Sequence, residues 1–282
     1  MLRRFYIVLS VVAFCCALLP APALAGAAHR LVAGTELIAD IVRDLLPGNV
    51  ELLTLIPASS CPGHHDIRAS DMAFFSKAEM VVIHRWQEDY PGIPEAMEAA
   101  QLSQDALKII DNRGSFLVPA NQIAASIQIA GLLALLEAVD KDALDARLQS
   151  RIARINALAD ECKALLEPYS GTPALSAFMQ EEFVRWTGMK VIAHYGRGED
   201  MSPGTLMNLA DKGKAAGVVV VVDNIQSGAD AGVPLARELK AAHVGFSNFP
   251  MFSPEAPTYE TLLKLNTILL RDALAVRLNN AN

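Results

Sequence analysis

The sequence predicts an α/β protein with two lobes, each with a mainly parallel sheet flanked by helices, joined by a long linker helix. Short apolar runs alternate with helical patterns in both halves of the chain, as in repeated β-α units. An amphipathic, proline-free stretch over residues 120–167 separates the two halves. Together these features predict two sheets and a helical connection between them.

Residues 1–25 have the form of a secretory signal peptide. Arg3 and Arg4 give a positive start, an apolar run follows over 5–19, and residues 23–25 have the small-x-small pattern of a cleavage site. The apolar run is too short for a helix that would stay in the membrane. The mature protein is therefore expected in the periplasm, without this segment.

The N-terminal lobe is expected over residues 26–118. Its predicted strands and helices, in chain order, cover 30–33, 36–46, 51–56, 71–78, 80–84 and 107–110. Helices between successive strands are typical of a parallel sheet, because parallel neighbours need a long crossover connection.

The linker helix region is expected over residues 119–168. Apolar residues recur along it at spacings of three and four, Asp140 or Asp142 is a suitable N-cap, and Pro168 ends the pattern. The pattern predicts either one long helix or two helices joined near Asp140.

The C-terminal lobe is expected over residues 169–282. Its predicted strands and helices cover 174–177, 179–187, 191–194, 204–215, 217–222, 230–241 and 244–246. Five consecutive valines at 218–222 suit a strand that is buried on both faces of a parallel sheet.

Charge and cysteine content exclude some classes of protein. The net charge is −7, and loss of Arg3 and Arg4 would make it −9, so nucleic acid is not an expected partner. Beyond the leader only Cys61 and Cys162 remain. They can form one disulfide in an oxidising compartment, but a buried, unreactive thiol is the expected state of Cys162, which falls on the apolar stripe of the linker.

A cluster of potential metal ligands follows the second and third predicted strands. Three of the six histidines lie there, His64, His65 and His84. Ligands bind beyond the carboxyl ends of strands in open α/β sheets, where these residues fall. Neutral imidazoles and carboxylates are ligands that zinc accepts at about 2.0 to 2.3 Å. Adjacent residues seldom bind one ion together, so one of the pair His64 and His65 is expected to coordinate.

Other residues have both a ligand and a structural interpretation. Asp223, at the end of the valine strand, is a candidate carboxylate from the second lobe or else a helix cap or turn former. His84 and His194 are each a candidate donor or simply a hydrogen-bonding residue at a strand end. Trp86 and Trp186 are expected to pack within the lobes.

Several local strings and their order carry a resemblance to a known family. The strings are RASDM at 68–72, KAEMVV at 77–82, VPAN at 118–121, EDMSP at 199–203 and NIQ at 224–226. In this order, over nearly the whole mature chain, they resemble the metal-binding receptors of ABC importers. That resemblance implies a monomeric periplasmic protein that delivers a divalent ion, zinc or manganese, to a permease in the inner membrane.

The resemblance also implies where further ligands lie and where this chain departs from the family. The position of a second family histidine, five residues before the proline that opens the linker, is Gly114. A third ligand falls near Glu181 and Glu182, and the fourth, an aspartate in the family, falls at Asn248. The predicted ligand set is therefore His64, His65, His84, Glu181 and Asp223, in a divergent member.

The sequence is compatible with three functions. The first is a receptor for a divalent metal, which binds without turnover. The second is a protein of the same fold that has lost the metal and holds another solute or a partner. The third is a metal-dependent hydrolase around a metal-bound water, although the chain contains no H-E-x-x-H or G-x-S-x-G string.

Overall fold

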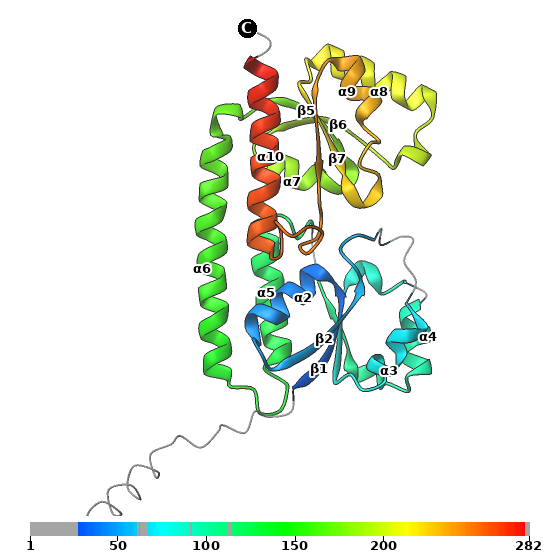
Figure 1. The fold of residues 1–282 in the computed structure, drawn as a ribbon, viewed down its shortest axis with the longest axis vertical. Coiled ribbons are helices and arrows are strands. Elements are labelled where there is room, and N and C mark those ends of the chain that lie inside the picture. The colour runs from blue at the N-terminus through cyan, green and yellow to red at the C-terminus, as the bar shows by residue number, and fades with distance from the viewer. Residues whose placement is uncertain (1–27, 61, 63–66, 91, 112–113, 280–282) are drawn as a thin grey trace, which may run out of the picture.

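The computed structural model describes residues 28–60, 62, 67–90, 92–111 and 114–279. The predicted signal peptide, Cys61, His64 and His65 lie outside these residues. In the described part, the chain forms two lobes, one above the other, each built on a four-stranded parallel sheet (Figure 1). The predicted fold class is confirmed.

The N-terminal lobe has strand order β2-β1-β3-β4. Its main elements are β1 (His29–Thr35), α2 (Glu36–Leu45), β2 (Val50–Ile56), α3 (Met72–Phe75), β3 (Met80–His84), α4 (Gly92–Ala99) and β4 (Leu107–Ile110). The β3 strand is buried along its whole length, which suits the apolar run that predicted it. The strands β2 and β3 lie on opposite sides of β1, so the strand order reverses there. A crevice is expected at this point of the carboxyl edge of the sheet.

The C-terminal lobe repeats this arrangement with strand order β6-β5-β7-β8. Its main elements are β5 (Pro173–Ala177), α7 (Glu181–Trp186), β6 (Lys190–Tyr195), α8 (Pro203–Ala216), β7 (Val220–Asn224), α9 (Val233–Leu239) and β8 (Ala242–Phe246). The last three valines of the run at 218–222 form the first three residues of β7, which is buried along its whole length, as predicted.

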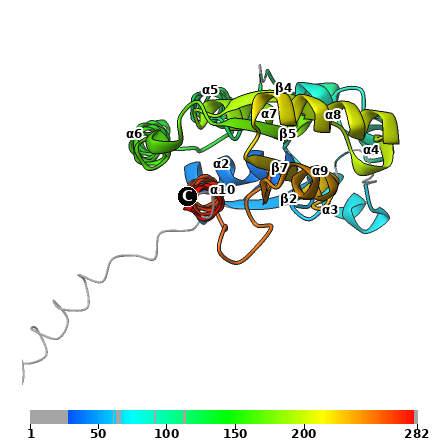
Figure 2. The ribbon, with the colours of Figure 1, turned by 90° about the horizontal axis from the view of Figure 1, so that it is seen from above.

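The linker region consists of two antiparallel helices, which is the second of the two alternatives that the sequence pattern allows. They are α5 (Pro119–Leu133) and α6 (Lys141–Leu166), and Asp140 caps α6 by accepting hydrogen bonds from the backbone N–H groups of Asp142 and Ala143. The α6 helix runs alongside both lobes and packs against α10 (Tyr259–Asn279), a helix that the sequence analysis did not predict (Figures 1 and 2).

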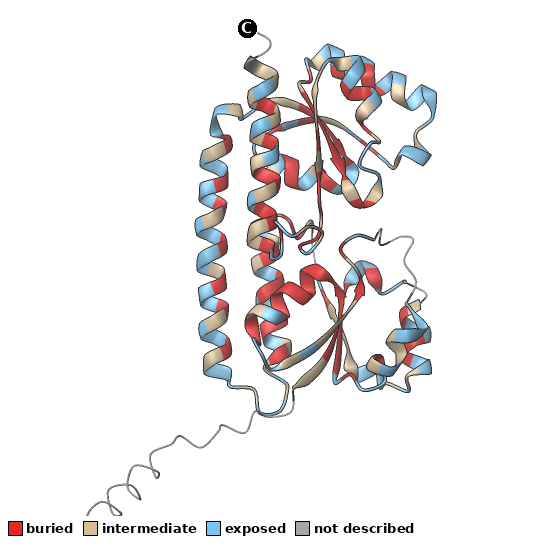
Figure 3. Ribbon diagram, in the orientation of Figure 1, coloured by how far each residue is buried: buried red, intermediate tan, exposed pale blue. Residues whose placement is uncertain are grey.

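Burial is concentrated on the strands and on the inner faces of the helices (Figure 3). One continuous core extends from α2 through α5 and α6 to α10 and the C-terminal sheet. Cys162 of α6 lies in that core as a free thiol, and burial raises its pKa. This agrees with the expected unreactive thiol. Of the helices in the described part, none is long and apolar enough to cross a membrane.

Candidate functional site

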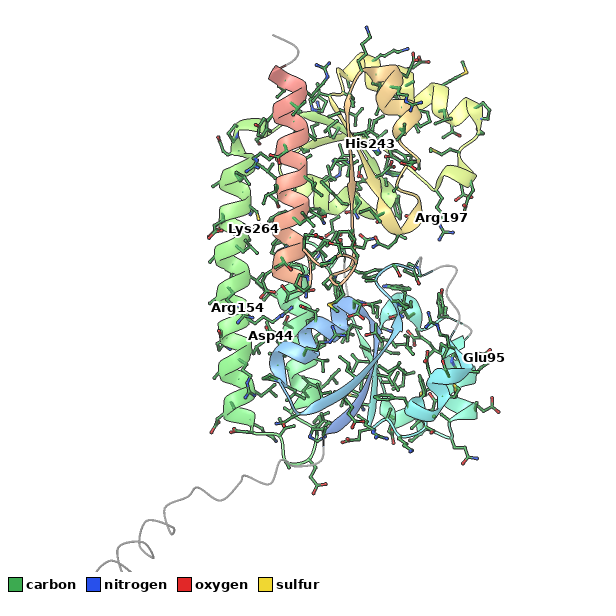
Figure 4. All side chains as sticks on the ribbon, in the orientation of Figure 1. Asp44, Glu95, Arg154, Arg197, His243 and Lys264 are labelled. Atoms are coloured by element: carbon green, nitrogen blue, oxygen red, sulfur yellow. The ribbon has the colours of Figure 1, made fainter. Side chains whose placement is uncertain are left out.

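A cavity of about 670 Å³ lies between the lobes at the carboxyl ends of both sheets. From the N-terminal lobe it is lined by His84, at the end of β3, and by the segment 114–117 that leads into α5. From the C-terminal lobe it is lined by residues that follow each strand, among them Arg197 after β6 (Figure 4). The predicted position of the site, at the carboxyl ends of the strands, matches this cavity.

His84 is held by its neighbours at the wall of this cavity. The side chain is 2 % exposed, and its Nε2 lies 2.7 Å from the hydroxyl of Thr35 at the end of the adjacent strand β1. The imidazole stacks on Trp86 and meets the edge of Phe116. These contacts fix the orientation of the ring, which is what a metal-binding histidine requires.

Glu181 opens α7, and its oxygens already have side-chain partners. Its carboxylate lies 2.7 Å from Nη2 of Arg185 and 2.6 Å from Nδ1 of His194. Burial alone would raise the pKa of Glu181, but the hydrogen bond from Arg185 and the charge of His194 outweigh burial and lower it. Glu181 is therefore a carboxylate at neutral pH, and a metal ion would compete with Arg185 and His194 for its oxygens.

Glu182 reaches across to the N-terminal lobe. Its carboxylate accepts hydrogen bonds from the backbone N–H of Ser115 at 2.5 Å and from the side-chain amide of Asn121 at 2.8 Å. Gly114 makes room for it, because a Cβ at that position would lie 2.4 Å from Oε1 of Glu182. The position where the family resemblance implies a histidine is thus filled by a carboxylate from the opposite lobe.

Neutral amides form part of the C-terminal wall of the cavity. Nε2 of Gln180 donates to the side-chain oxygens of Asn224 and Asn248, at 3.0 and 2.8 Å. Gln226 donates to the carbonyl of Ala58, in the loop after β2, and so also connects the two lobes. Asn248, the counterpart of the family's aspartate, is held in this amide network and carries no charge.

Asp223 lies outside the lining of the cavity. The residue is fully buried and accepts hydrogen bonds from the hydroxyl of Tyr195 at 2.7 Å and from the backbone N–H of Gly232 at 2.9 Å. Its other oxygen lies 2.6 Å from Nε2 of His243. Burial and the adjacent carboxylate raise the pKa of Tyr195, so the phenol stays protonated and donates. The structure therefore does not bring Asp223 together with His84 and Glu181.

Two acidic residues and one histidine of the described chain line the same cavity, namely Glu181, Glu182 and His84. No group of three potential ligands is close enough to hold an ion within the described residues. Pro62, in the loop that carries His64 and His65, also lines the cavity. A complete metal site would therefore need the loop histidines or a rearrangement of the glutamates.

The chain matches a protein-family model over residues 31–273, and that family is described as the periplasmic zinc-uptake complex component A, ZnuA. The chain belongs to the ZnuA family. A comparison with curated proteins finds no match.

Solved structures of related fold agree with this membership. A crystal structure of ZnuA superposes with a TM-score of 0.72 at 18% identity, over 87% of this chain and 99% of that one. A cadmium-bound periplasmic metal binding protein from Candidatus Liberibacter asiaticus gives a TM-score of 0.73 at 14% identity, over 86% and 98%. At these identities the likeness shows a shared fold.

Membership decides between classes of function. ZnuA-family proteins bind metal as periplasmic solute receptors and are not enzymes, so the hydrolase interpretation is set aside. The expectation of a metal-binding protein is confirmed at the level of the family.

Sequence reasoning did not anticipate several residues of the cavity in this ZnuA-family protein. Trp86 was expected inside a lobe but is 43% exposed and lines the cavity, as does Phe178, which is 59% exposed. Trp186 does pack within its lobe, stacked on Phe183. The position of Trp86, two residues after a buried strand that ends in histidine, is the signal that indicates the cleft.

Proposed function

We propose that this protein is an extracytoplasmic receptor that binds zinc or manganese between its lobes and delivers the ion to an ABC permease of the inner membrane. The observation that carries the proposal is the interlobe cavity, in which His84 and the two glutamates of α7 lie at the edges of opposite lobes. Ligands from both lobes let an ion hold the cleft closed, and a permease can recognise the closed form.

We propose His84, Glu181 and one of the pair His64 and His65 as metal ligands. His84 supplies an imidazole in a fixed orientation, and Glu181 supplies a charged carboxylate. Glu182 is a further candidate if its bonds to Ser115 and Asn121 open. Asp223, the remaining residue of the predicted set, is assigned a structural role because its oxygens accept from Tyr195, Gly232 and His243.

Metal titration of the untagged apoprotein tests the proposal. Elemental analysis and calorimetry with zinc and manganese should give one tightly bound ion per chain. His84→Gln should weaken binding at least tenfold, which corresponds to about 1.4 kcal/mol. His29→Gln is the matched control, because His29 begins β1 at the opposite end of the sheet, beside Glu79, and its loss should leave the affinity unchanged.

The double variant His64→Ala with His65→Ala tests the loop. Loss of binding is expected, whereas unchanged affinity would remove the loop from the site. Absence of bound zinc and manganese from the wild-type protein would instead favour a protein of this fold that holds another solute. The neutral Asn248 and the missing side chain at Gly114 are the features on which that alternative depends.

A further inference from the structure

We propose that Gln226 is a positioning residue for metal binding, because its side-chain amide fixes the turn at residues 57–60 against the C-terminal lobe. This inference rests on the proposed function, since the turn leads, within the N-terminal lobe, into the segment with the candidate ligands His64 and His65. Gln226 forms hydrogen bonds to atoms of both lobes.

The turn at 57–60 follows strand β2 at the carboxyl edge of the N-terminal sheet. A hydrogen bond of 3.0 Å from the backbone N–H of Ser60 to the carbonyl of Pro57 closes it. Ala58, inside the turn, is 5% exposed and belongs to the continuous core of the protein. Two residues beyond the turn, Pro62 lines the interlobe cavity. The position of the turn therefore determines where the chain enters the cavity.

Gln226 supplies the bond that holds this turn to the C-terminal lobe. Its Nε2 donates to the carbonyl of Ala58 at 3.0 Å and to Oγ of Ser247 at 2.8 Å. Its Oε1 accepts from the backbone N–H of Asn248 at 3.0 Å. The N–H of Asn248 needs an acceptor and the carbonyl of Ala58 needs a donor, so only one orientation of the amide satisfies both.

The partners of Gln226 in the C-terminal lobe are themselves fixed. Ser247 is fully buried, and its hydroxyl donates to the carbonyl of Phe249 at 3.0 Å. The carbonyl of Ser247 accepts from the side-chain amide of Asn266 on α10, also at 3.0 Å. These bonds join the turn to the end of β8 and to α10. If the turn moved away from the C-terminal lobe, the buried carbonyl of Ala58 would lose its donor, which costs free energy.

Metal affinity should depend on Gln226 although its side chain is not a ligand. Both Nε2 and Oε1 are bonded to protein atoms, so the amide has no group to offer an ion. A segment that is fixed before the ion arrives loses less conformational entropy on binding, and this raises the affinity. Coupling between two sites acts in both directions, so a bound ion should in turn stabilise the bonds of Gln226.

Zinc titration of Gln226→Met tests the proposal on the full mature chain. Methionine has an unbranched side chain of similar length without an N–H group, so the affinity for zinc should fall about tenfold. Ser247→Ala is the matched control, because it removes a bond of Gln226 within the C-terminal lobe and leaves the bond to Ala58. This control should lower stability to urea and leave the affinity unchanged. Equal losses of affinity in the two variants would overturn the positioning role.

Amide exchange of the wild type gives a second readout, which does not depend on the folding of a variant. Zinc should slow exchange about tenfold both at Ser60, which closes the turn, and at Asn248, which donates to Gln226 from the other lobe. Asp105, whose backbone N–H bonds Ser103 before the amino end of β4, is the control amide. Slower exchange at Ser60 with no change at Asn248 would overturn the coupling through Gln226.

Failure of this proposal can be told from failure of the metal receptor. Wild-type protein and Gln226→Met that bind zinc equally tightly would overturn the positioning role and leave the receptor. Wild-type protein that binds neither zinc nor manganese would overturn both.

Discussion

Glu182 on α7 accepts a hydrogen bond of 2.5 Å from the backbone N–H of Ser115, on the opposite side of the cleft. Its second oxygen accepts from Asn121 on α5. A single carboxylate thus holds the C-terminal lobe to the segment that leads into α5, at the point where Gly114 leaves space for it. Opening and closing of the cleft should therefore depend on this side chain.

Glu182→Gln should loosen the contact between the lobes. A glutamine can accept from Ser115 or from Asn121, but its NH₂ group then faces the other donor. Loss of a hydrogen bond to a charged acceptor corresponds to about 1.5 to 3 kcal/mol, so amide exchange at Ser115 should speed up about tenfold or more. Glu95→Gln on α4, far from the cleft, is the control (Figure 4). Unchanged exchange at Ser115 would show that the contact does not hold the lobes.

The fold was predictable because its elements are marked by local patterns. Buried parallel strands appear as apolar runs, and the run at 218–222 and the cap at Asp140 both mark real elements. The sequence pattern did not indicate the α10 helix. This helix packs against α6 and both lobes, so its sequence shows no simple polar face. Its packing is set by tertiary contacts, which the sequence pattern does not contain.

The site was only partly predictable because hydrogen-bond partners decide the direction of a side chain. His84 follows from its position at the end of a predicted strand and Glu181 from the family resemblance, and the structure places both residues at the cavity. Asp223 also ends a strand, but its carboxylate turns to Tyr195 and His243. Those partners come from other strands, so no local signal at Asp223 indicates that its oxygens are occupied.

Asp223→Asn should lower stability without changing metal affinity. The buried carboxylate accepts from Tyr195, Gly232 and His243, and an amide cannot accept all three bonds. The free energy of unfolding should fall by about 2 kcal/mol or more. Glu181→Gln should show the opposite pattern, with weaker metal binding and little loss of stability. Urea unfolding and metal titration of both variants separate a structural aspartate from a ligand.

Arg151→Met should destabilise the packing contact between α2, α6 and α10. The guanidinium is 1% exposed and lies 2.7 Å from Asp40, whose other oxygen accepts from the backbone N–H of Tyr259. Removal of one partner from a buried ion pair destabilises by about 3 to 5 kcal/mol. Burial raises the pKa of Asp40 even beside Arg151, so the unpaired carboxyl should take up a proton in the variant.

Two further variants complete this test by urea unfolding. Asp40→Asn added to Arg151→Met should recover part of the loss, because no buried charge remains. Arg85→Met removes exposed ion pairs with Glu88 and Asp111 and should change the free energy of unfolding by less than about 1 kcal/mol. Equal effects of Arg151→Met and Arg85→Met would contradict a structural role for the buried pair.

Glu79→Gln should reduce the loss of stability at acid pH. Burial alone would raise the pKa of Glu79, but hydrogen bonds from His29 and the backbone N–H of Arg30 outweigh it and hold the pKa below its ordinary value of 4.5. A lowered carboxyl pKa stabilises the folded state above the unfolded value, and this stabilisation disappears as the pH falls from 4.5 through the folded pKa. Urea unfolding at a series of pH values should therefore give a shallower slope below pH 4.5 for Glu79→Gln than for the wild type. Glu95→Gln is the control, and an equal slope in Glu79→Gln and wild type would show that His29 and Arg30 do not stabilise the charged carboxylate.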